Sequence, residues 1–242
     1  MTNASLMDVS LLFEDEHLLV VAKPSGLAVH RGLCRDGPFL VDVLRAHSKA
    51  PLHPVHRLDR GTSGALIIAK HVTTARALGV LFQQGSIEKS YLALVRGTAP
   101  TSAIVEHAIP DNKNNKQIPA ETAVCRLASV RRNESPLRER TYSLVEAHPK
   151  TGRFHQVRRH LKHLGHPLIG DVNYGRSEHN RWCREHFGLA RLALHAHRLR
   201  LPHPSTGDPL AVFAPLPVDL HGPLVAMGFE EQCLNGSEQG PR

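Results

Sequence analysis

Short strand-like segments recur along this 242-residue chain, and three helical segments interrupt them. Residues 11–23 are typical of a hairpin that Pro24 stops. Further strands are predicted over residues 65–69, 90–95, 104–109, 123–130, 141–147, 192–201 and 210–213. Helices are predicted over residues 40–47, 72–84 and 155–164, and Gly85 is placed to end the second one. Because strands and helices do not alternate regularly, the sequence predicts an α+β fold.

The length and composition predict one folded domain with disordered ends. A chain of this length, 41% hydrophobic, can bury a substantial core. We expect a single domain over residues 10–229, a flexible N-terminus over residues 1–9 and a disordered polar tail over residues 230–242.

The charge and the cysteines narrow the class of protein. A formal net charge of +8, with a pI near 9.7, favours a polyanionic partner, because phosphate contacts release counterions. The chain has no run of eighteen apolar residues and no signal-peptide pattern at its start, so we expect a cytoplasmic protein with no membrane contact. The scattered cysteines predict reduced thiols: Cys34, Cys125, Cys183 and Cys233.

The most informative segment is residues 56–64, His-Arg-Leu-Asp-Arg-Gly-Thr-Ser-Gly. This polar loop leads directly into the apolar strand predicted over residues 65–69, and such a strand holds a loop rigidly at a sheet edge. Gly61 and Gly64 allow the loop to turn tightly. Asp59 is therefore a candidate catalytic carboxylate. Taken alone, an Asp beside two arginines is more often a structural ion pair.

Residues 56–64 resemble the active-site motif of the pseudouridine synthases of the ribosomal large subunit synthase A family. Four further segments resemble motifs of that family and follow in the same order: residues 21–30, 88–97, 151–161 and 165–171. The resemblance implies a long, mixed, mostly antiparallel sheet with flanking helices and a central RNA-binding cleft. It also implies that residues 10–229 are a catalytic domain, with no separate N-terminal RNA-binding domain.

The resemblance implies an isomerase that converts uridine to pseudouridine without metal or cofactor. The bond from ribose C1′ to base N1 is broken, and C1′ is joined to C5. Asp59 matches the catalytic aspartate, which either attacks C1′ or deprotonates C2′; the sequence leaves both routes open. Arg158 matches the arginine that pairs with this aspartate. Tyr91 matches the tyrosine that packs on the target base and could accept the C5 proton.

Other residues are predicted to contact the RNA. Arg57 matches the arginine that fills the gap left by the everted nucleotide, with a structural ion pair as the alternative. Four cations are expected near phosphates: Lys23, Lys89, Arg153 and Arg159. Leu168 and Ile169 are expected either to form an apolar floor near the base or to pack in the core. The arginines of residues 126–140 either contact RNA or belong to a mobile turn: Arg126, Arg131, Arg132, Arg138 and Arg140.

Features of the C-terminal half narrow the choice of RNA substrate. The segments 149–161 and 185–196 resemble the subgroup of the family that modifies uridine 65 in the T-arm stem of tRNA. We therefore expect a protein that acts on tRNA. Separately, we expect a monomer. Ribosomal RNA and another tRNA position stay open, because residues 112–140 do not resemble that subgroup closely.

Two other classes of function compete with this interpretation. One is a non-catalytic RNA-binding chaperone. The other is a metal-dependent hydrolase built on the histidines: His155, His160, His163, His166, His195 and His197. His160 and His163 share a helical face, but no cysteine or paired carboxylate completes an obvious zinc site. We expect no metal.

Overall fold

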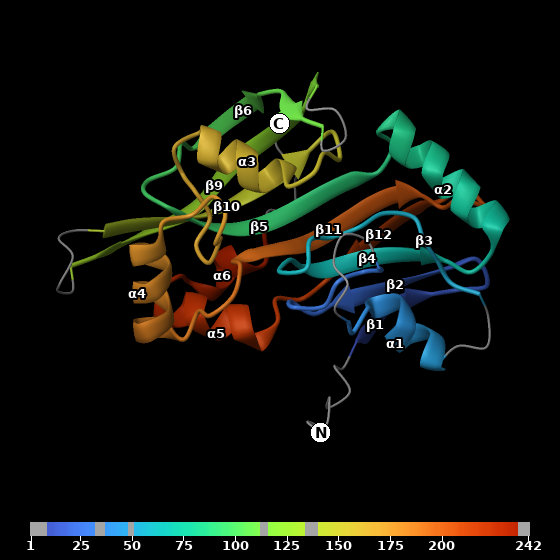
Figure 1. Cartoon of the computed structure of the whole chain (residues 1–242), viewed down its shortest axis with the longest axis horizontal. Coiled ribbons are helices and arrows are strands. Elements are labelled where there is room, and N and C mark those ends of the chain that lie inside the picture. The colour runs from blue at the N-terminus through green and yellow to red at the C-terminus, as the bar shows by residue number, and fades with distance from the viewer. Residues whose placement is uncertain (1–8, 32–36, 48–50, 112–115, 134–139, 237–242) are drawn as a thin grey trace. The chain divides into compact units, whose positions relative to one another are not determined.

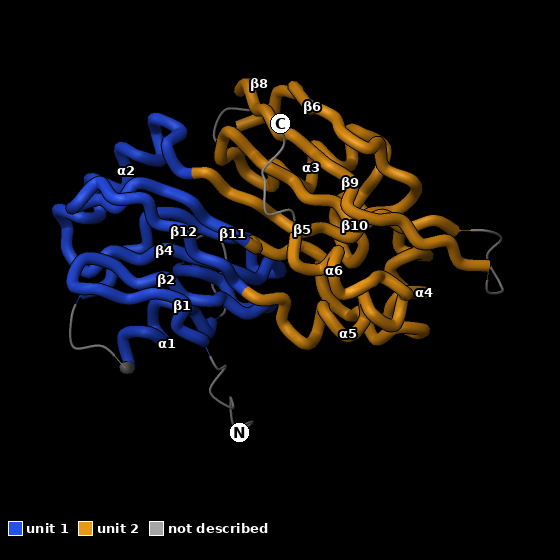
Figure 2. Tube along the Cα trace, turned by 180° about the vertical axis from the view of Figure 1, so that it is seen from behind, with its two compact units in different colours: residues 1–87, 198–214 blue, residues 88–197, 215–242 orange. Residues whose placement is uncertain are grey.

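The computed structural model describes residues 9–31, 37–47, 51–111, 116–133 and 140–236 (Figure 1). The chain divides into two compact units (Figure 2). Unit 1 comprises residues 1–87 and 198–214, and unit 2 comprises residues 88–197 and 215–242. Both units contain strands and helices, and the fold is α+β with a mixed, mostly antiparallel sheet, as predicted. The predicted central cleft stays a prediction.

Unit 1 begins with the predicted hairpin, in which β1 (Ser10–Glu14) pairs antiparallel with β2 (Leu18–Lys23). β2 also pairs antiparallel with β4 (Ser63–Ala69), and the short β3 (His53–Pro54) pairs with β4. The remaining elements are α1 (Leu40–His47), α2 (Val72–Gln84) and β12 (Pro209–Phe213). β11 (Leu194–Pro202) starts in unit 2, and its residues from Arg198 onward belong to unit 1, where they pair with β12.

The core of unit 1 explains why the candidate catalytic loop is held firmly. Every residue of β4 is buried. Ala65 and Ile67 of β4 pack in one cluster with Val20 of β2 and Leu78 of α2. α2 ends at Gly85, whose φ of 73° lets Ser86 donate its N–H to the carbonyl of Leu81. The loop at residues 56–62 therefore precedes a strand that is fixed along its whole length.

Unit 2 is built on four antiparallel strands. β10 (Arg140–Pro149) pairs with β5 (Glu88–Arg96) on one side and β9 (Glu121–Arg132) on the other, and β9 pairs with β6 (Ser102–Glu106). β7 (Ile109–Pro110) and β8 (Gln117–Ile118) form a separate small ladder. The helices of unit 2 are α3 (Gln156–His163), α4 (Ser177–Phe187), α5 (Val218–Ala226) and α6 (Glu231–Leu234).

The period-2 alternation of β10 separates two cores in unit 2. Val145 and Ala147 face a cluster that contains Val157 and Leu161 of α3. Tyr142 and Leu144 face the opposite cluster, which contains residues of α4, α5 and α6. The sheet of unit 2 thus carries α3 on one face and the three other helices on the other, as Figure 1 shows. The residues of the family-like motif at 151–161 belong to the α3 face.

Some predictions require correction. The sequence did not predict α4, α5 or α6. The tail expected to be disordered from residue 230 carries α6, in which Leu234 is buried. Residues 1–8 and 237–242 lie outside the described residues. The catalytic domain predicted over residues 10–229 would comprise both units, and it stays a prediction. No helix in the described ranges is long and apolar enough to cross a membrane.

Candidate active site

The loop that carries Asp59 is fastened to the first family-like motif. Gly26 donates its N–H to the carbonyl of Arg60 at 2.8 Å, and Arg60 returns a hydrogen bond from Nε to the carbonyl of Gly26 at 2.9 Å. Ser25 donates its hydroxyl to the carbonyl of Gly61 at 2.8 Å. Two segments about 35 residues apart therefore form one rigid piece of unit 1.

Asp59 occupies a tight turn within this piece. Its carbonyl accepts a hydrogen bond from the N–H of Thr62 at 3.0 Å, and its side chain is half-buried. Leu58 and Thr62, on either side, are buried. The buried neighbours anchor the turn and leave the Asp59 side chain partly exposed, which suits a group that must meet a substrate.

Lys23 has a different role from the one predicted. It is 1% exposed, and its ammonium donates to three carbonyls: those of Pro24 at 2.8 Å, Leu27 at 2.7 Å and Arg60 at 3.3 Å. A buried ammonium with these acceptors holds the loop and cannot reach an RNA phosphate. The prediction of a phosphate contact at Lys23 was therefore wrong. Arg57, by contrast, is exposed, as a residue that inserts into a nucleic-acid stack must be.

In unit 2, the loop before α3 is organised by the buried side chain of Gln156. Its Oε1 accepts hydrogen bonds from the hydroxyl of Thr151 at 2.6 Å and from the N–H of Arg153 at 2.9 Å. Its Nε2 donates to the carbonyl of Glu121 at 2.8 Å and to the hydroxyl oxygen of Thr122 at 3.0 Å. One amide thereby ties the start of α3 to β9. This fixes the direction in which α3 leaves the loop.

Arg158 of α3 forms a buried, two-pronged ion pair with Asp171. Nε lies 2.7 Å from Oδ2, and Nη2 lies 2.9 Å from Oδ1. Arg158 is 7% exposed and Asp171 is 1% exposed. Burial opposes ionisation of Asp171, but the hydrogen bonds and the charge of Arg158, with the N–H groups of Tyr174 and Asn173, hold its pKa below the ordinary value. Asp171 therefore fixes the plane of the Arg158 guanidinium.

Asp171 was not among the predicted site residues, although it is the last residue of the motif at 165–171. Gly170 brings it into position. Its φ is 76°, and a Cβ atom at this place would lie 1.8 Å from the carbonyl oxygen of Arg191. Only glycine fits both the backbone angle and this close approach.

We therefore expect Gly170→Ala to lower the free energy of unfolding by about 1–3 kcal/mol, because the residue would be strained and would collide with a fixed backbone. Thermal unfolding measures this loss. Gly79→Ala in α2 is the control, since a Cβ there meets nothing within 4 Å; it should leave stability the same or slightly higher. An unchanged melting temperature for Gly170→Ala would contradict the assigned role.

Tyr174 connects the Asp171 loop to α3. Its hydroxyl accepts a hydrogen bond from Nε of Arg159 at 2.9 Å and lies 3.2 Å from Nδ1 of His155. The guanidinium carbon of Arg158 lies 5.2 Å from the centre of the Tyr174 ring. His155 precedes α3 with a φ of 53°, which is uncommon for a residue other than glycine. Arg158 is thus held by both a carboxylate and an aromatic ring.

The model of the RNA pseudouridylate synthase family matches residues 17–163 of this chain. A tRNA pseudouridine synthase C of Vibrio cholerae serotype O1 is 36% identical to it, over 93% of this chain and 98% of the relative. This chain belongs to the RNA pseudouridylate synthase family. Its substrate is accordingly an RNA, and its chemistry is that of an isomerase.

Other members of the family agree with this assignment. A tRNA pseudouridine synthase C of Salmonella typhimurium is 40% identical, over 86% of this chain and 85% of that enzyme. The solved structure of human RNA Pseudouridylate Synthase Domain Containing 1 has a TM-score of 0.72 and 28% identity, covering 91% of this chain and 89% of that one. Human RNA Pseudouridylate Synthase Domain Containing 4 has a TM-score of 0.71 and 26% identity, covering 90% and 92%.

The predicted catalytic residues of this family member are divided between the two units. Asp59 belongs to unit 1, whereas Tyr91 and Arg158 belong to unit 2. Tyr91 lies on β5, partly buried against the cluster that contains Val157 and Leu161 of α3. Tyr91 therefore packs against the same core as α3, the helix that carries Arg158. The ion pair between Asp59 and Arg158 stays a prediction.

The predicted RNA contacts have varied surroundings. Lys89 is partly buried, which lowers its pKa, and its ammonium donates to the carbonyl of Thr151 at 3.3 Å. Arg153 is exposed. Leu168 and Ile169 are each 1% exposed and belong to different core clusters, so the core-packing alternative holds for both.

Two members of the arginine cluster, Arg126 and Arg140, make structural contacts. Arg140 is buried over the ring of Trp182, with 4.6 Å between the guanidinium carbon and the ring centre. Arg126 donates from Nη1 to the carbonyl of Ala99 at 2.7 Å. Arg138 lies outside the described residues. Burial and local acceptors therefore disfavour the RNA-contact alternative for Arg140 and Arg126.

The histidines of unit 2 make structural contacts. His160 is buried, which lowers its pKa, and its Nε2 lies 2.9 Å from the carbonyl oxygen of His107. The ring of His107 also stacks on His163, with 3.8 Å between ring centres. Within the described ranges, no group of three or more His, Cys, Asp or Glu residues could hold a metal ion.

Proposed function

We propose that this family member isomerises a uridine of tRNA to pseudouridine, with Asp59 as the catalytic carboxylate. The observation that carries the proposal is the fastening of the Asp59 turn to residues 25–26, which joins two family-like motifs into one preorganised piece. The net charge of +8 supports a polyanionic substrate.

The chemistry requires a carboxylate near the sugar and a means of retaining the detached base. Asp59 either attacks C1′ and displaces N1, or removes a proton from C2′ as the bond to N1 breaks. The base then turns and forms a bond from C5 to C1′. On the first route this breaks the bond between C1′ and Asp59, and on the second route Asp59 returns the proton to C2′. N1 gains a proton, and the C5 proton leaves. We propose that Tyr91 packs on the base and accepts this proton. Arg57 fills the space that the everted nucleotide leaves.

We also propose that Arg158 pairs with Asp59 while Asp171 holds it. The ion pair with Asp171 uses Nε and Nη2 of Arg158 and fixes the guanidinium in a plane. Such a fixed cation can orient a second carboxylate with little loss of side-chain entropy. Asp171 then acts on the reaction through Arg158 and is a positioning residue.

The proposed target is uridine 65 in the T-arm stem. Resemblance of residues 149–161 and 185–196 to the corresponding subgroup supports it. The relatives of Vibrio cholerae and Salmonella typhimurium are named tRNA pseudouridine synthase C, which supports a tRNA substrate. Such a substrate is consistent with a cytoplasmic location.

Tritium release from RNA labelled at C5 of uridine tests the substrate class. We expect the purified protein to release tritium from bulk tRNA and to release little from ribosomal RNA of equal uridine content. Release from ribosomal RNA alone would contradict the tRNA assignment. Binding of tRNA without release from either RNA would contradict the enzymatic activity and favour the chaperone alternative.

A further inference from the structure

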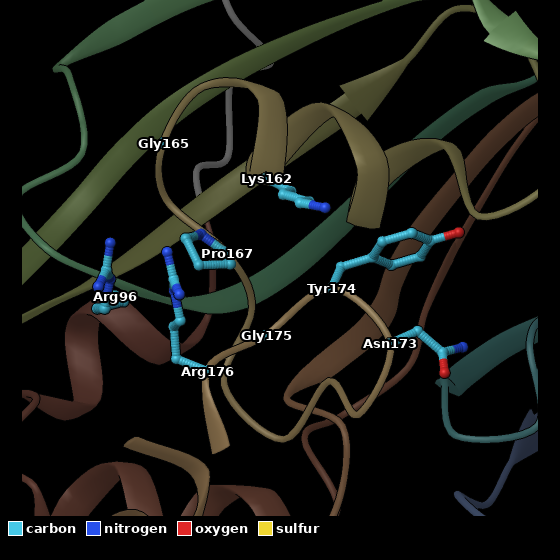
Figure 3. Close-up of a pocket in the computed structure, with 8 residues that line it drawn as sticks. All are labelled: Arg96, Lys162, Gly165, Pro167, Asn173, Tyr174, Gly175 and Arg176. Atoms are coloured by element: carbon cyan, nitrogen blue, oxygen red, sulfur yellow. The ribbon is translucent and has the colours of Figure 1, made fainter. Parts of the chain in front are cut away.

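A pocket of about 330 Å³ lies in unit 2 and is lined in part by Tyr174 (Figure 3), whose ring contacts Arg158. Its lining includes Arg96 at the end of β5, Lys162 of α3, and Tyr174 and Arg176 from the loop before α4. Arg96 donates its N–H to the carbonyl of Pro167, which also lines the pocket. Three separate elements therefore bring cations to one concave surface.

The cations of this pocket are not neutralised within the described part of the chain. Arg96, Lys162 and Arg176 have no carboxylate at salt-bridge distance there. The nearby His179 is half-buried, and this burial, with the charges of Arg96, Arg140 and Arg176, lowers its pKa despite the opposing charge of Glu178. Burial is the larger cause of this shift, and the three arginine charges add to it. The pocket is therefore a site of excess positive charge.

Tyr174 helps to position the ammonium of Lys162. The Lys162 ammonium lies 5.7 Å from the centre of the Tyr174 ring and points toward it in Figure 3. In the same view, Arg96 and Arg176 point in a common direction. Tyr174 is itself fixed, because its N–H donates to Asp171 and its hydroxyl accepts from Arg159. The pocket is thus built onto the same loop that holds Arg158.

We propose that this pocket binds a backbone phosphate of the RNA substrate, at a nucleotide other than the one that is isomerised. The proposal rests on the proposed function. Two guanidinium groups and an ammonium supply charge-assisted hydrogen bonds to phosphate oxygens. A volume of about 330 Å³ accommodates a phosphate with part of its nucleoside. The contact sets the register of the RNA and takes no part in bond breaking.

The test compares two variants that each lose two positive charges. Arg96→Gln/Arg176→Gln removes the arginines of the pocket. Arg181→Gln/Arg184→Gln removes two exposed arginines of α4 that do not line it. The affinity for tRNA is measured over a range of salt concentrations, together with kcat, KM and the melting temperature.

We expect the pocket variant to lower the magnitude of the slope of log affinity against log salt by about one, because the pocket holds one phosphate and each phosphate contact contributes about one. KM should rise and kcat should stay within about twofold of wild type. The α4 variant should leave the slope near wild type. Arg96→Lys/Arg176→Lys keeps both charges and should retain most of the salt slope. This result would show that the smaller slope of the Gln variant comes from the lost charge and not from misfolding.

Equal slopes for the pocket and α4 variants would overturn the proposal, as would a fall in kcat with unchanged KM. These outcomes leave the proposed function standing, because wild-type tritium release from tRNA is measured in the same preparation. Absence of that release would instead refute the proposed function.

Discussion

Asp59→Asn is expected to lower the rate of pseudouridine formation by at least about 10³-fold, which corresponds to about 4 kcal/mol of transition-state stabilisation. The amide can neither attack C1′ nor remove a proton from C2′, so both routes are closed. The Asp59 backbone hydrogen bond to Thr62 is retained. Folding and RNA affinity should therefore stay close to wild type.

Initial rates of tritium release, RNA affinity and thermal unfolding measure this prediction. Asp208→Asn is a matched control, because Asp208 is an exposed aspartate of the same unit; it should release tritium at the wild-type rate. Release by Asp59→Asn at the rate of the control would show that the reaction uses another group.

Asp171→Asn is expected to cost about 3–5 kcal/mol of stability, because it leaves the buried guanidinium of Arg158 without its carboxylate. Chemical denaturation measures the loss. Lys150→Gln, which breaks the surface pair with Glu121, is the control and should cost less than about 1 kcal/mol. Equal costs for the two variants would contradict the importance of the buried pair.

The same carboxylate predicts an acid dependence of stability. The folded-state pKa of Asp171 lies below its unfolded value. Its contribution is therefore present above about pH 4, the usual range for an unfolded aspartate, and is lost as pH falls through the folded pKa. Asp171→Asn should remove this part of the acid dependence. If the stability of Asp171→Asn fell with decreasing pH as the stability of the wild type does, the acid dependence would come from other carboxylates.

The elements with strong local signals were predictable. The hairpin of β1 and β2 and the helix α2 with its Gly85 stop have their periodicity and their turn residues in the sequence itself. α4 has few apolar residues, and its place depends on Trp182, which stacks on Tyr142 at 5.7 Å between ring centres. α5 contains Pro223 and carries no clear periodicity. Tertiary burial stabilises both helices, and a sequence pattern does not report it.

Candidate site residues could be chosen from the sequence where they lie within a motif that resembles one of the family. Asp59 and Arg158 stand in such motifs, and the family match covers both. Lys23 was misassigned because a lysine after a buried strand looks like any surface cation until its carbonyl acceptors are known. Asp171 was missed because its role in the site is to hold Arg158, and this contact joins residues that are 13 positions apart in the chain.

Mapping pseudouridine base by base in an unmodified tRNA transcript tests the central claim most directly. The transcript is incubated with purified protein or with Asp59→Asn. New pseudouridine should appear at uridine 65 with the wild-type protein and nowhere with the variant. No new pseudouridine with wild type, or the same new pseudouridine with both proteins, would contradict the account.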